Sequence, residues 1–225
     1  MSRLPYAHVV FDWNGTLLDD LTLAVHGVNH VLGNHGRAPI TADQYRANFH
    51  FPIQSFYASL GFDFEAIPFS QIVSEYLSIF DARVPDCPLH EDVHRCLTRL
   101  KAEQLDASIL SASHQDILSH CVSGHRLTDY FRFTMGLSDN HAVSKVEQGR
   151  ALSKRLGLAP EKVLYIGDTT HDADVAKANG WSCILVSQGH QHRDRLEATG
   201  WPVVECLEAA FPFMETTGQS QGEES

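Results

Sequence analysis

Paired cysteines, long apolar runs and an excess of positive charge are all missing from this sequence. Its five cysteines are scattered without a Cys-x-x-Cys pair, which argues against a disulfide framework and a structural zinc site. No apolar run is long enough to predict a membrane span. Asp and Glu outnumber Lys and Arg by 28 to 17, and the net charge of -11 disfavours binding to nucleic acid or to anionic membranes. We therefore expect reduced cysteines and no nucleic-acid or membrane partner.

The amino terminus also lacks the pattern of a secretory signal. Residues 1–5 lead almost directly into a strand-like run, so we expect a cytoplasmic location by default. With 225 residues, of which 43% are hydrophobic, the chain is long enough for one globular domain with a small insert. An anionic substrate would need a locally positive pocket or a bound cation to offset the negative charge. Nothing in the sequence specifies an oligomeric state.

Six short apolar runs predict β-strands. They are bounded by Gly, Asp, Ser or Pro and lack period-2 alternation, which is typical of strands covered on both faces. Helical patterns lie between them, such as residues 172–179, which end before Gly180 as a helix cap. Strands that alternate with helices predict an α/β fold, a Rossmann-like parallel sheet with helices on both faces. The predicted strands are residues 7–11, 107–110, 131–135, 163–166, 182–186 and 203–204.

Residues 18–84 break this alternation, because they contain no convincing strand. Four helical patterns cover the stretch instead, and Thr41 opens the second of them as a cap. We therefore predict a small all-helical cap inserted after the first strand. The catalytic core would consist of residues 1–17 and 85–217, and the polar tail, 218–225, is expected to be disordered.

Two features near these elements are interpreted as structural. Asp19 and Asp20 precede the first cap helix, where acids favour the helix dipole or cap the first turn. Fourteen histidines are spread along the whole chain, and the densest spot, around His190 and His192, is predicted to be a loop that leads into a helix. We do not predict a dedicated metal site there.

Polar residues gather where four of the predicted elements meet one edge of the sheet. The segment DWNGT (12–16) follows the first strand, SAS (111–113) follows the second, and GDTTHD (167–172) follows the fourth. Lys145 stands near the third strand, at the start of a helix, with Ser144 as its cap. Because ligands of open parallel sheets bind beyond the carboxyl ends of the strands, these segments predict a single site.

The residue types in these segments suit phosphoryl transfer. A carboxylate at a strand end can attack phosphorus and form an aspartyl phosphate. Several carboxylates repel one another unless a cation joins them, and Asp12, Asp168 and Asp172 supply the hard oxygens that Mg²⁺ prefers. Gly15 permits a close backbone approach, so that neighbouring amides can face phosphate oxygens. A Ser hydroxyl and a Lys ammonium would bind the remaining charge.

This ordered set resembles the four motifs of the haloacid dehalogenase superfamily, and the resemblance covers nearly the whole chain. The helical insert resembles the cap of the phosphoglycolate phosphatase-like branch, as does the carboxyl-terminal end with residues 186–190. The motif residues are Asp12 to Leu17 for DxDGTL with Asn14 at the second acidic position, Ser111 for the second motif, Lys145 for the third, and Asp168 with Asp172 for GDxxxD.

The resemblance implies a magnesium-dependent phosphatase. Asp12 would attack the phosphoryl group of a small phosphorylated metabolite. Mg²⁺ would be held by Asp12, the backbone carbonyl of Asn14 and Asp168, with Asp172 acting directly or through water. The cap would close over the site and read the rest of the substrate.

The resemblance also implies a set of phosphate-binding groups. Ser111 and Lys145 would bind the transferred phosphoryl group, and Lys145 would also hold the nucleophile in place. Backbone amides near Trp13 and Asn14 and at Ala112 would complete the cage of donors around the phosphate oxygens.

Asn14 departs from the family pattern, because phosphatases of the family carry a second Asp there as general acid and base. An amide cannot deliver and retrieve a proton, and losing that group costs on the order of 10²–10⁴ in rate. Three consequences are open: a substrate with a good leaving group, another acid such as His50, His114 or His171, or a slow phosphatase or non-enzymatic phosphate-binding protein.

Two other chemistries of the superfamily fit less well. Phosphonoacetaldehyde hydrolases have Ala at the position of Asn14 and need a cap lysine, but the first lysine of this chain is Lys101. Haloacid dehalogenases keep an aromatic residue at that position and use no metal, whereas this chain has both Asp168 and Asp172.

The cap segment 46–52 lies between two predicted helices, where this cap type presents its specificity loop. We expect Arg46 or His50 to meet an anionic substrate. The substrate itself stays open: phosphoglycolate is the guess inherited from the branch, beside small sugar phosphates and nucleotides.

Overall fold

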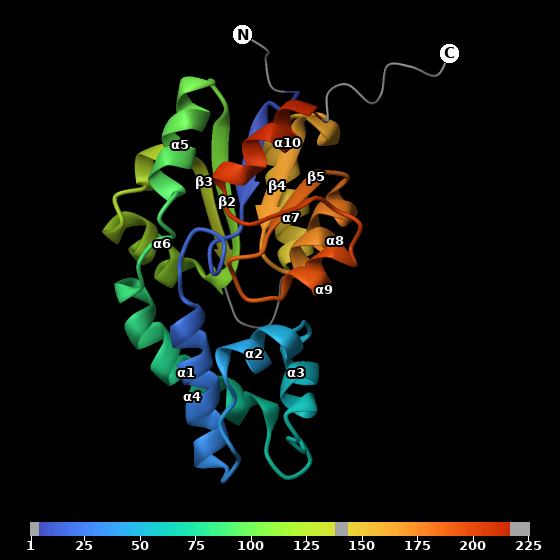
Figure 1. Cartoon of the computed structure of the whole chain (residues 1–225). Helices are drawn as coiled ribbons and strands as arrows, with labels where there is room; N and C mark the ends of the chain where they lie inside the picture. The colour runs from blue at the N-terminus through green and yellow to red at the C-terminus, as the bar shows by residue number, and fades with distance from the viewer. Residues whose placement is uncertain (1–4, 138–143, 217–225) are drawn as a thin grey trace.

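The sheet in the computed structural model of this chain has six parallel strands in the order β3-β2-β1-β4-β5-β6 (Figure 1). The structure describes residues 5–137 and 144–216. β1 is central, and all four of its residues are buried, including His8, whose ring lies 2.9 Å from the Ser108 hydroxyl. The strands are β1 (His8–Phe11), β2 (Asp106–His114), β3 (Phe131–Leu137), β4 (Val163–Gly167), β5 (Ser182–Val186) and β6 (Val203–Val204).

Helices cover both faces of the sheet, so the predicted α/β Rossmann-like fold is confirmed. Alternate strand residues point to opposite faces: Phe11 packs in one core and Val10 in the other. The first face holds α5 (Val93–Ala102), α6 (Gln115–Gly124) and α10 (Phe211–Thr216), and the second holds α7 (Lys145–Leu156), α8 (Thr170–Asn179) and α9 (Arg193–Glu197). Short 3₁₀ turns are η1 (Val84–Asp86), η2 (Thr128–Tyr130), η3 (Pro160–Lys162) and η4 (Glu208–Ala210).

Four further helices follow β1 and lie beyond the carboxyl-end edge of the sheet, at the bottom of Figure 1. The second begins at the predicted Thr41 cap, whose hydroxyl accepts from the Gln44 amide at 3.1 Å. The first and fourth pack against each other, with Gly27 in contact with the Tyr76 ring. The assignment of residues 18–84 to a separate cap stays a prediction. These helices are α1 (Leu21–Asn34), α2 (Ala42–Asn48), α3 (Ile53–Ser59) and α4 (Phe69–Arg83).

Several local predictions can be compared with the structure. Gly180 ends α8 in the left-handed conformation, with φ 70°, as predicted. β2 continues beyond the predicted end at residue 110, because pairing with β3 shifts register after Leu110 and resumes at His114. Ser111 therefore lies within β2 and not after it.

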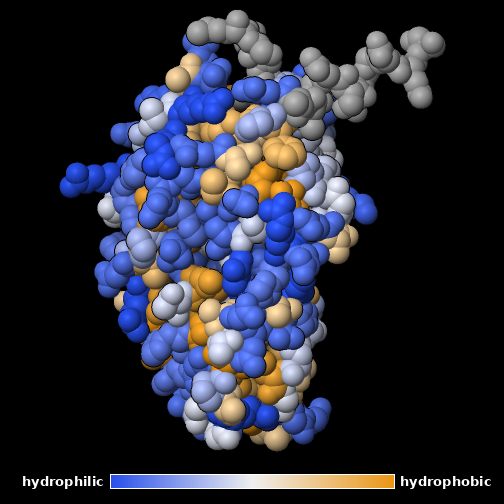
Figure 2. Space-filling view, in the orientation of Figure 1, coloured by the Kyte–Doolittle hydropathy of each residue, from blue (hydrophilic) through white to orange (hydrophobic). Residues whose placement is uncertain are grey.

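The predicted tail, 218–225, lies outside the described residues. All five cysteines are free, and all lie in the described part of the chain. Within the described residues, no helix combines the length and the apolar character that crossing a membrane requires. The cytoplasmic location stays a prediction. Hydrophilic residues predominate on the face shown in Figure 2, with smaller apolar areas over both the sheet and the helical insert.

Candidate active site

Asp12 stands at the carboxyl end of the central strand, directly after β1. Its backbone amide donates to Ile166 of β4 at 2.9 Å, which continues the pairing of Phe11 with Ile166. The residue is 8% exposed. Asp168 follows β4 in the same way, so the two carboxylates are brought to one edge of the sheet, where ligands of open parallel sheets bind.

Lys145 joins two of the predicted acidic residues. Its ammonium Nζ lies 2.9 Å from Asp12 Oδ1 and 2.7 Å from Asp172 Oδ1. Lys145 is the first residue of α7, after the predicted Ser144 cap, and it is 5% exposed. A buried ammonium needs such partners, because burial without them strongly disfavours a charge. We call Asp12, Lys145, Asp168 and Asp172 the Asp12 cluster.

Asp172 is the most fully bonded member of the Asp12 cluster. Beside Lys145, its Oδ1 accepts from the Tyr165 hydroxyl at 3.1 Å. Its Oδ2 accepts from the amides of Asp168 and Thr169, at 3.1 and 2.9 Å, and from the Thr169 hydroxyl at 2.7 Å. These bonds fix the loop between β4 and α8. Burial raises the pKa of Asp172, but Lys145 and the Thr169 hydroxyl hold that pKa below its usual range.

The Asp12 cluster fits a hard divalent cation. Carboxylate oxygens of Asp12, Asp168 and Asp172 lie within 4.8 Å of one another. Burial, opposed by Lys145, raises the pKa of Asp12, and burial also raises the pKa of Asp168. Three buried carboxylates against one ammonium leave negative charge that a cation would neutralise. The chemistry of these donors therefore suits Mg²⁺, and the grouping supports the predicted metal ligands.

Asp168 is held by two segments far from it in sequence. Its Oδ1 accepts from the Thr16 hydroxyl at 2.9 Å, and its Oδ2 accepts from the His190 amide at 2.7 Å. Gly15, with φ 73°, lies against Asp168, and a Cβ there would overlap Asp168 and the His190 ring. Glycine is required at this position for both its conformation and its lack of a side chain.

The predicted phosphate-binding residues lie around the end of β1 and in β2. The Trp13 amide donates to Asp12 Oδ1 at 2.7 Å, which orients the carboxylate. The buried Ser111 hydroxyl accepts from the Ser113 amide at 3.0 Å. Ala112 is exposed. The binding roles of Trp13, Ser111 and Ala112 stay predictions.

A second hydrogen-bonded network adjoins the Asp12 cluster at Gly15. Asn14 Nδ2 donates to Asp20 Oδ2 at 2.9 Å, and Asp20 Oδ1 accepts from the Gly15 amide at 2.8 Å. His190 Nε2 lies 3.1 Å from Asp20 Oδ1, and its Nδ1 lies 3.1 Å from the Tyr45 hydroxyl. We call Asn14, Asp20, Tyr45 and His190 the Asp20 network. It joins the loop after β1 to cap helix α2 and to the loop after β5.

The ion pair in the Asp20 network is fully internal, since Asp20 is 1% and His190 5% exposed. Burial alone would lower the pKa of His190, but Asp20 and the more distant Asp168 and Asp12 raise it to about 9. His190 is therefore a cation at neutral pH. Counting both networks, four buried carboxyl groups face two buried cationic side chains: Asp12, Asp20, Asp168 and Asp172 against Lys145 and His190.

Sequence reasoning missed the Asp20 network. Asp20 does occupy the N-cap position of α1, but its side chain makes no capping hydrogen bond, so the predicted capping role is wrong. The carboxylate turns instead toward Gly15 and His190. The predicted loop before α9 is confirmed, and its His190 forms an ion pair with Asp20. The only sequence signal was an acid beside Asp19 within eight residues of Asp12.

The predicted cap residue Arg46 lies between the cap and the core. Its guanidinium donates to the carbonyl oxygens of Ser187 and Gln191. His50 Nδ1 lies 2.6 Å from the Asn48 carbonyl oxygen. The roles of Arg46 and His50 in substrate recognition stay predictions.

Two other histidines were considered as substitutes for the acid at position 14. His171 packs against the Phe51 ring of the cap, with ring centroids 4.7 Å apart. His114 Nδ1 accepts from the Asp116 amide at 3.3 Å and so caps α6. Burial lowers the pKa of His171, and the charges of Lys145 and Asp172 also act on it. The roles of His171 and His114 in proton transfer stay predictions.

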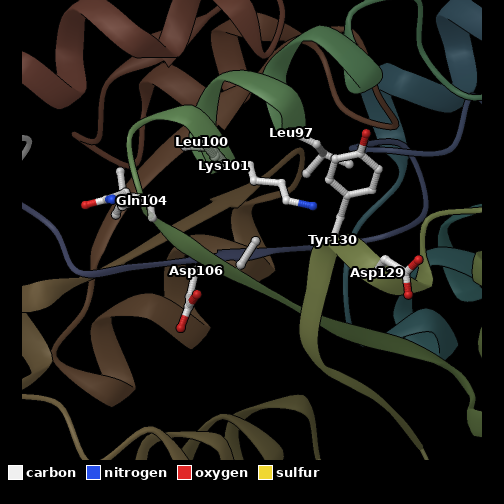
Figure 3. Close-up of a pocket in the computed structure, with 9 residues that line it drawn as sticks. Leu97, Leu100, Lys101, Gln104, Asp106, Asp129 and Tyr130 are labelled. Atoms are coloured by element: carbon white, nitrogen blue, oxygen red, sulfur yellow. The ribbon is translucent and has the colours of Figure 1, made fainter.

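A pocket of about 320 Å³ lies elsewhere, between α5, the 3₁₀ turn η2 and the start of β2 (Figure 3). Lys101, Asp106 and Tyr130 are among the residues that line it. Asp106 begins β2, so the pocket is at the amino end of the strand, opposite the Asp12 cluster. It takes no part in the candidate site.

Comparisons with known proteins agree with this geometry. Residues 9–186 match the family model described as haloacid dehalogenase-like hydrolase. A phosphoglycolate phosphatase from Rhodobacter capsulatus is 27% identical over 188 residues, which are 81% of this chain and 85% of that protein.

Two solved structures share the fold. A haloacid dehalogenase-like family hydrolase from Streptococcus pneumoniae has a TM-score of 0.80 at 19% identity, covering 93% of this chain and 98% of that one. Protein tyrosine kinase A from Mycobacterium tuberculosis has a TM-score of 0.79 at 20% identity, with the same coverage. Because proteins of different activity share this fold, function has to be argued from the site.

Proposed function

Because the chain belongs to the haloacid dehalogenase-like hydrolase family, as its motifs predicted, we propose that it is a Mg²⁺-dependent phosphatase that hydrolyses a small phosphomonoester through an aspartyl-phosphate intermediate. The similarity to phosphoglycolate phosphatases supports the phosphatase class. The observation that carries the mechanism is the contact of Lys145 with Asp12 at the end of β1.

In this mechanism Asp12 is the nucleophile. Lys145 and the Trp13 amide both contact its Oδ1, so the carboxylate has one fixed orientation before a substrate arrives. One carboxylate oxygen forms a bond to phosphorus as the bond to the leaving oxygen breaks. Water then adds to phosphorus and releases phosphate, and the electron pair of the broken bond returns to Asp12.

Asp12, Asp168 and the backbone carbonyl of Asn14 are the metal ligands in this proposal. Bound Mg²⁺ would neutralise the carboxylates and the phosphoryl oxygens. Asp172 already accepts five hydrogen bonds, and we assign it to holding Lys145 and the loop after β4, with any metal contact through water.

The transferred phosphoryl group would be bound by Lys145, by the Ser111 hydroxyl and by amides near Trp13, Asn14 and Ala112. The cap, residues 18–84, would close over the substrate, with Arg46 and His50 as candidate contacts to its remaining part. The substrate is a small phosphorylated metabolite, and the relatives make phosphoglycolate the first compound to assay. We place this activity in the cytoplasm.

The test is turnover of p-nitrophenyl phosphate by the full chain with Mg²⁺ and with a chelator. We expect Asp12→Asn to lower kcat by at least about 10³-fold while the fold is kept, because the nucleophile is lost. Asp19→Asn is the matched control, since Asp19 is exposed and seven residues away. Turnover that survives Asp12→Asn, or that is unchanged when a chelator removes Mg²⁺, contradicts the proposal.

Asn14 favours a second candidate, a catalytically weak or non-enzymatic phosphate-binding protein. An amide at this position cannot move a proton, whereas the other motif residues, Asp12, Ser111, Lys145 and Asp168, are all present. A screen of phosphorylated metabolites, with and without Mg²⁺, separates the two candidates. Robust turnover of any of them eliminates the binding protein.

A further inference from the structure

The side-chain amide of Asn14 is held at both ends. Its Nδ2 donates to Asp20 Oδ2 at 2.9 Å, and its Oδ1 accepts from the Ser113 hydroxyl at 2.6 Å. A side-chain amide has two N–H donors, so one N–H is left for a ligand while the carbonyl end is engaged. Residue 14 therefore offers a ligand a hydrogen bond, and it has no proton to transfer.

The two groups behind Asn14 are closed to a ligand as well. Asp20 accepts from Asn14 with one oxygen, and from the Gly15 amide and His190 with the other. Both ring nitrogens of His190 have partners, Asp20 and the Tyr45 hydroxyl. Both side chains are at least nine-tenths buried. Asp20 and His190 therefore hold the Asn14 side chain in place, and neither has a free donor to offer to the reacting atoms.

We propose that Asp20 and His190 are positioning residues that hold Asn14 as a hydrogen-bond donor, and that the site consequently takes phosphoryl compounds with weakly basic leaving oxygens. Acyl phosphates, phosphoanhydrides and aryl or enol phosphates belong to this class. The inference rests on the proposed function and narrows it, since alkyl phosphates have strongly basic leaving oxygens.

The chemistry balances without a general acid. As Asp12 bonds to phosphorus, the leaving oxygen departs with the electron pair of its bond, accepts a hydrogen bond from Asn14, and takes its proton from solvent. In the second step water adds to phosphorus and the bond to Asp12 breaks with its electron pair returning to the carboxylate. One proton of the water stays on its oxygen in the released phosphate, and the other passes to another phosphate oxygen. Only a leaving group that is stable as an anion departs quickly in this way.

Asp20 also determines what a reversion at position 14 can achieve. In the Asn14→Asp variant, two buried carboxylates would face each other at hydrogen-bond distance, and they would repel or share one proton between them. The shared proton would be held in the hydrogen bond between residue 14 and Asp20, and residue 14 could not donate it to the leaving oxygen. Exchanging both residues, Asn14→Asp with Asp20→Asn, keeps one carboxylate and one amide but moves the carboxylate to the position beside the leaving group.

The experiment measures kcat/KM with Mg²⁺ for phenyl phosphates whose leaving groups differ in basicity. We expect the wild-type rate to fall steeply from p-nitrophenyl phosphate to phenyl phosphate. The quantity to compare is the ratio of kcat/KM for p-nitrophenyl phosphate to kcat/KM for phenyl phosphate. In the Asn14→Asp/Asp20→Asn variant this ratio should be smaller than in the wild type by about 10-fold or more, because a general acid supplies roughly 10²–10⁴-fold in rate. Asn14→Asp alone should leave the ratio near the wild-type value, as should the exposed control Asp19→Asn.

The ratio does not depend on how much of the protein is folded, so a merely structural role of Asp20 leaves it unchanged. A shallow dependence in the wild type, or a single Asn14→Asp variant that matches the double variant, overturns the inference. Turnover that survives Asp12→Asn overturns the proposed function instead.

A second measurement needs no variant at position 14. The wild type should hydrolyse acetyl phosphate at least about 10²-fold faster than glycerol phosphate, because only the first has a weakly basic leaving oxygen. Equal rates on both compounds overturn the inference but leave the phosphatase assignment intact. Absence of turnover of either compound, and of every phenyl phosphate, overturns both.

Discussion

The Asp12 cluster and the Asp20 network adjoin each other at Gly15, and they use buried charge in opposite ways. In the Asp12 cluster three carboxylates share one ammonium, so the charges do not balance. In the Asp20 network one carboxylate faces one imidazolium, and neutral hydrogen-bonding groups close both ends. An acidic cluster with too few cationic partners attracts a metal cation, and that cation would in turn attract an anionic substrate. A balanced pair instead fixes the position of its neighbours.

The two networks also differ in what they connect. The Asp12 cluster joins the ends of β1 and β4 to the start of α7, all within the core. The Asp20 network includes Tyr45 of α2, so a cap residue reaches a buried pair beside Asp168. A short chain of hydrogen bonds therefore connects α2 with the edge of the sheet that carries the Asp12 cluster.

The largest effect on this comparison is expected from removing the ammonium of the Asp12 cluster. Lys145→Met leaves Asp12 and Asp172 without their cation, and breaking a buried ion pair costs about 3–5 kcal/mol of unfolding free energy. The loss should be measured by urea unfolding without metal, and phosphatase activity should fall by at least about 10²-fold.

Lys154→Met is the matched control for this variant, because Lys154 is an exposed lysine on the same helix. Its substitution should change the unfolding free energy by less than about 0.5 kcal/mol. Equal effects of the two substitutions would show that the ammonium of Lys145 does not stabilise the acidic residues.

A smaller effect is expected at the cap end of the Asp20 network. Tyr45→Phe removes one hydrogen bond to His190 but keeps the ring, which stacks on Phe49 with centroids 4.8 Å apart. We expect a loss of about 1 kcal/mol in unfolding free energy. We also expect a change in KM larger than the change in kcat, since the Asp12 cluster is untouched. A fall in kcat equal to that of Lys145→Met would contradict the division into two networks.

The fold and the Asp12 cluster were predictable from sequence for a local reason. Uninterrupted apolar runs such as residues 163–166 mark strands buried on both faces. Asp12 and Asp168 stand directly after β1 and β4, and Lys145 and Asp172 lie in the first turns of α7 and α8. The end of β2 was missed because a register shift with β3 after Leu110 leaves no mark in the polar segment that follows.

Sequence patterns could not predict the Asp20 network. Asp20 and His190 are 170 residues apart, and their contact depends on how the loop after β5 packs against the start of the cap. Locally, an acid before a helix predicts a capping residue. The packing of Gly15 against Asp168 and His190 overrides that preference, and only the folded chain shows it.

The most direct test of the account is to trap the intermediate on Asp12. The full chain is mixed with acetyl phosphate and Mg²⁺, quenched with acid, and the peptide that contains Asp12 is analysed by mass spectrometry. The account predicts a hydroxylamine-sensitive phosphoryl group on that peptide in the wild type and in Asp19→Asn, and none in Asp12→Asn. Turnover without any phosphorylated peptide, or the same phosphorylation in Asp12→Asn, would contradict it.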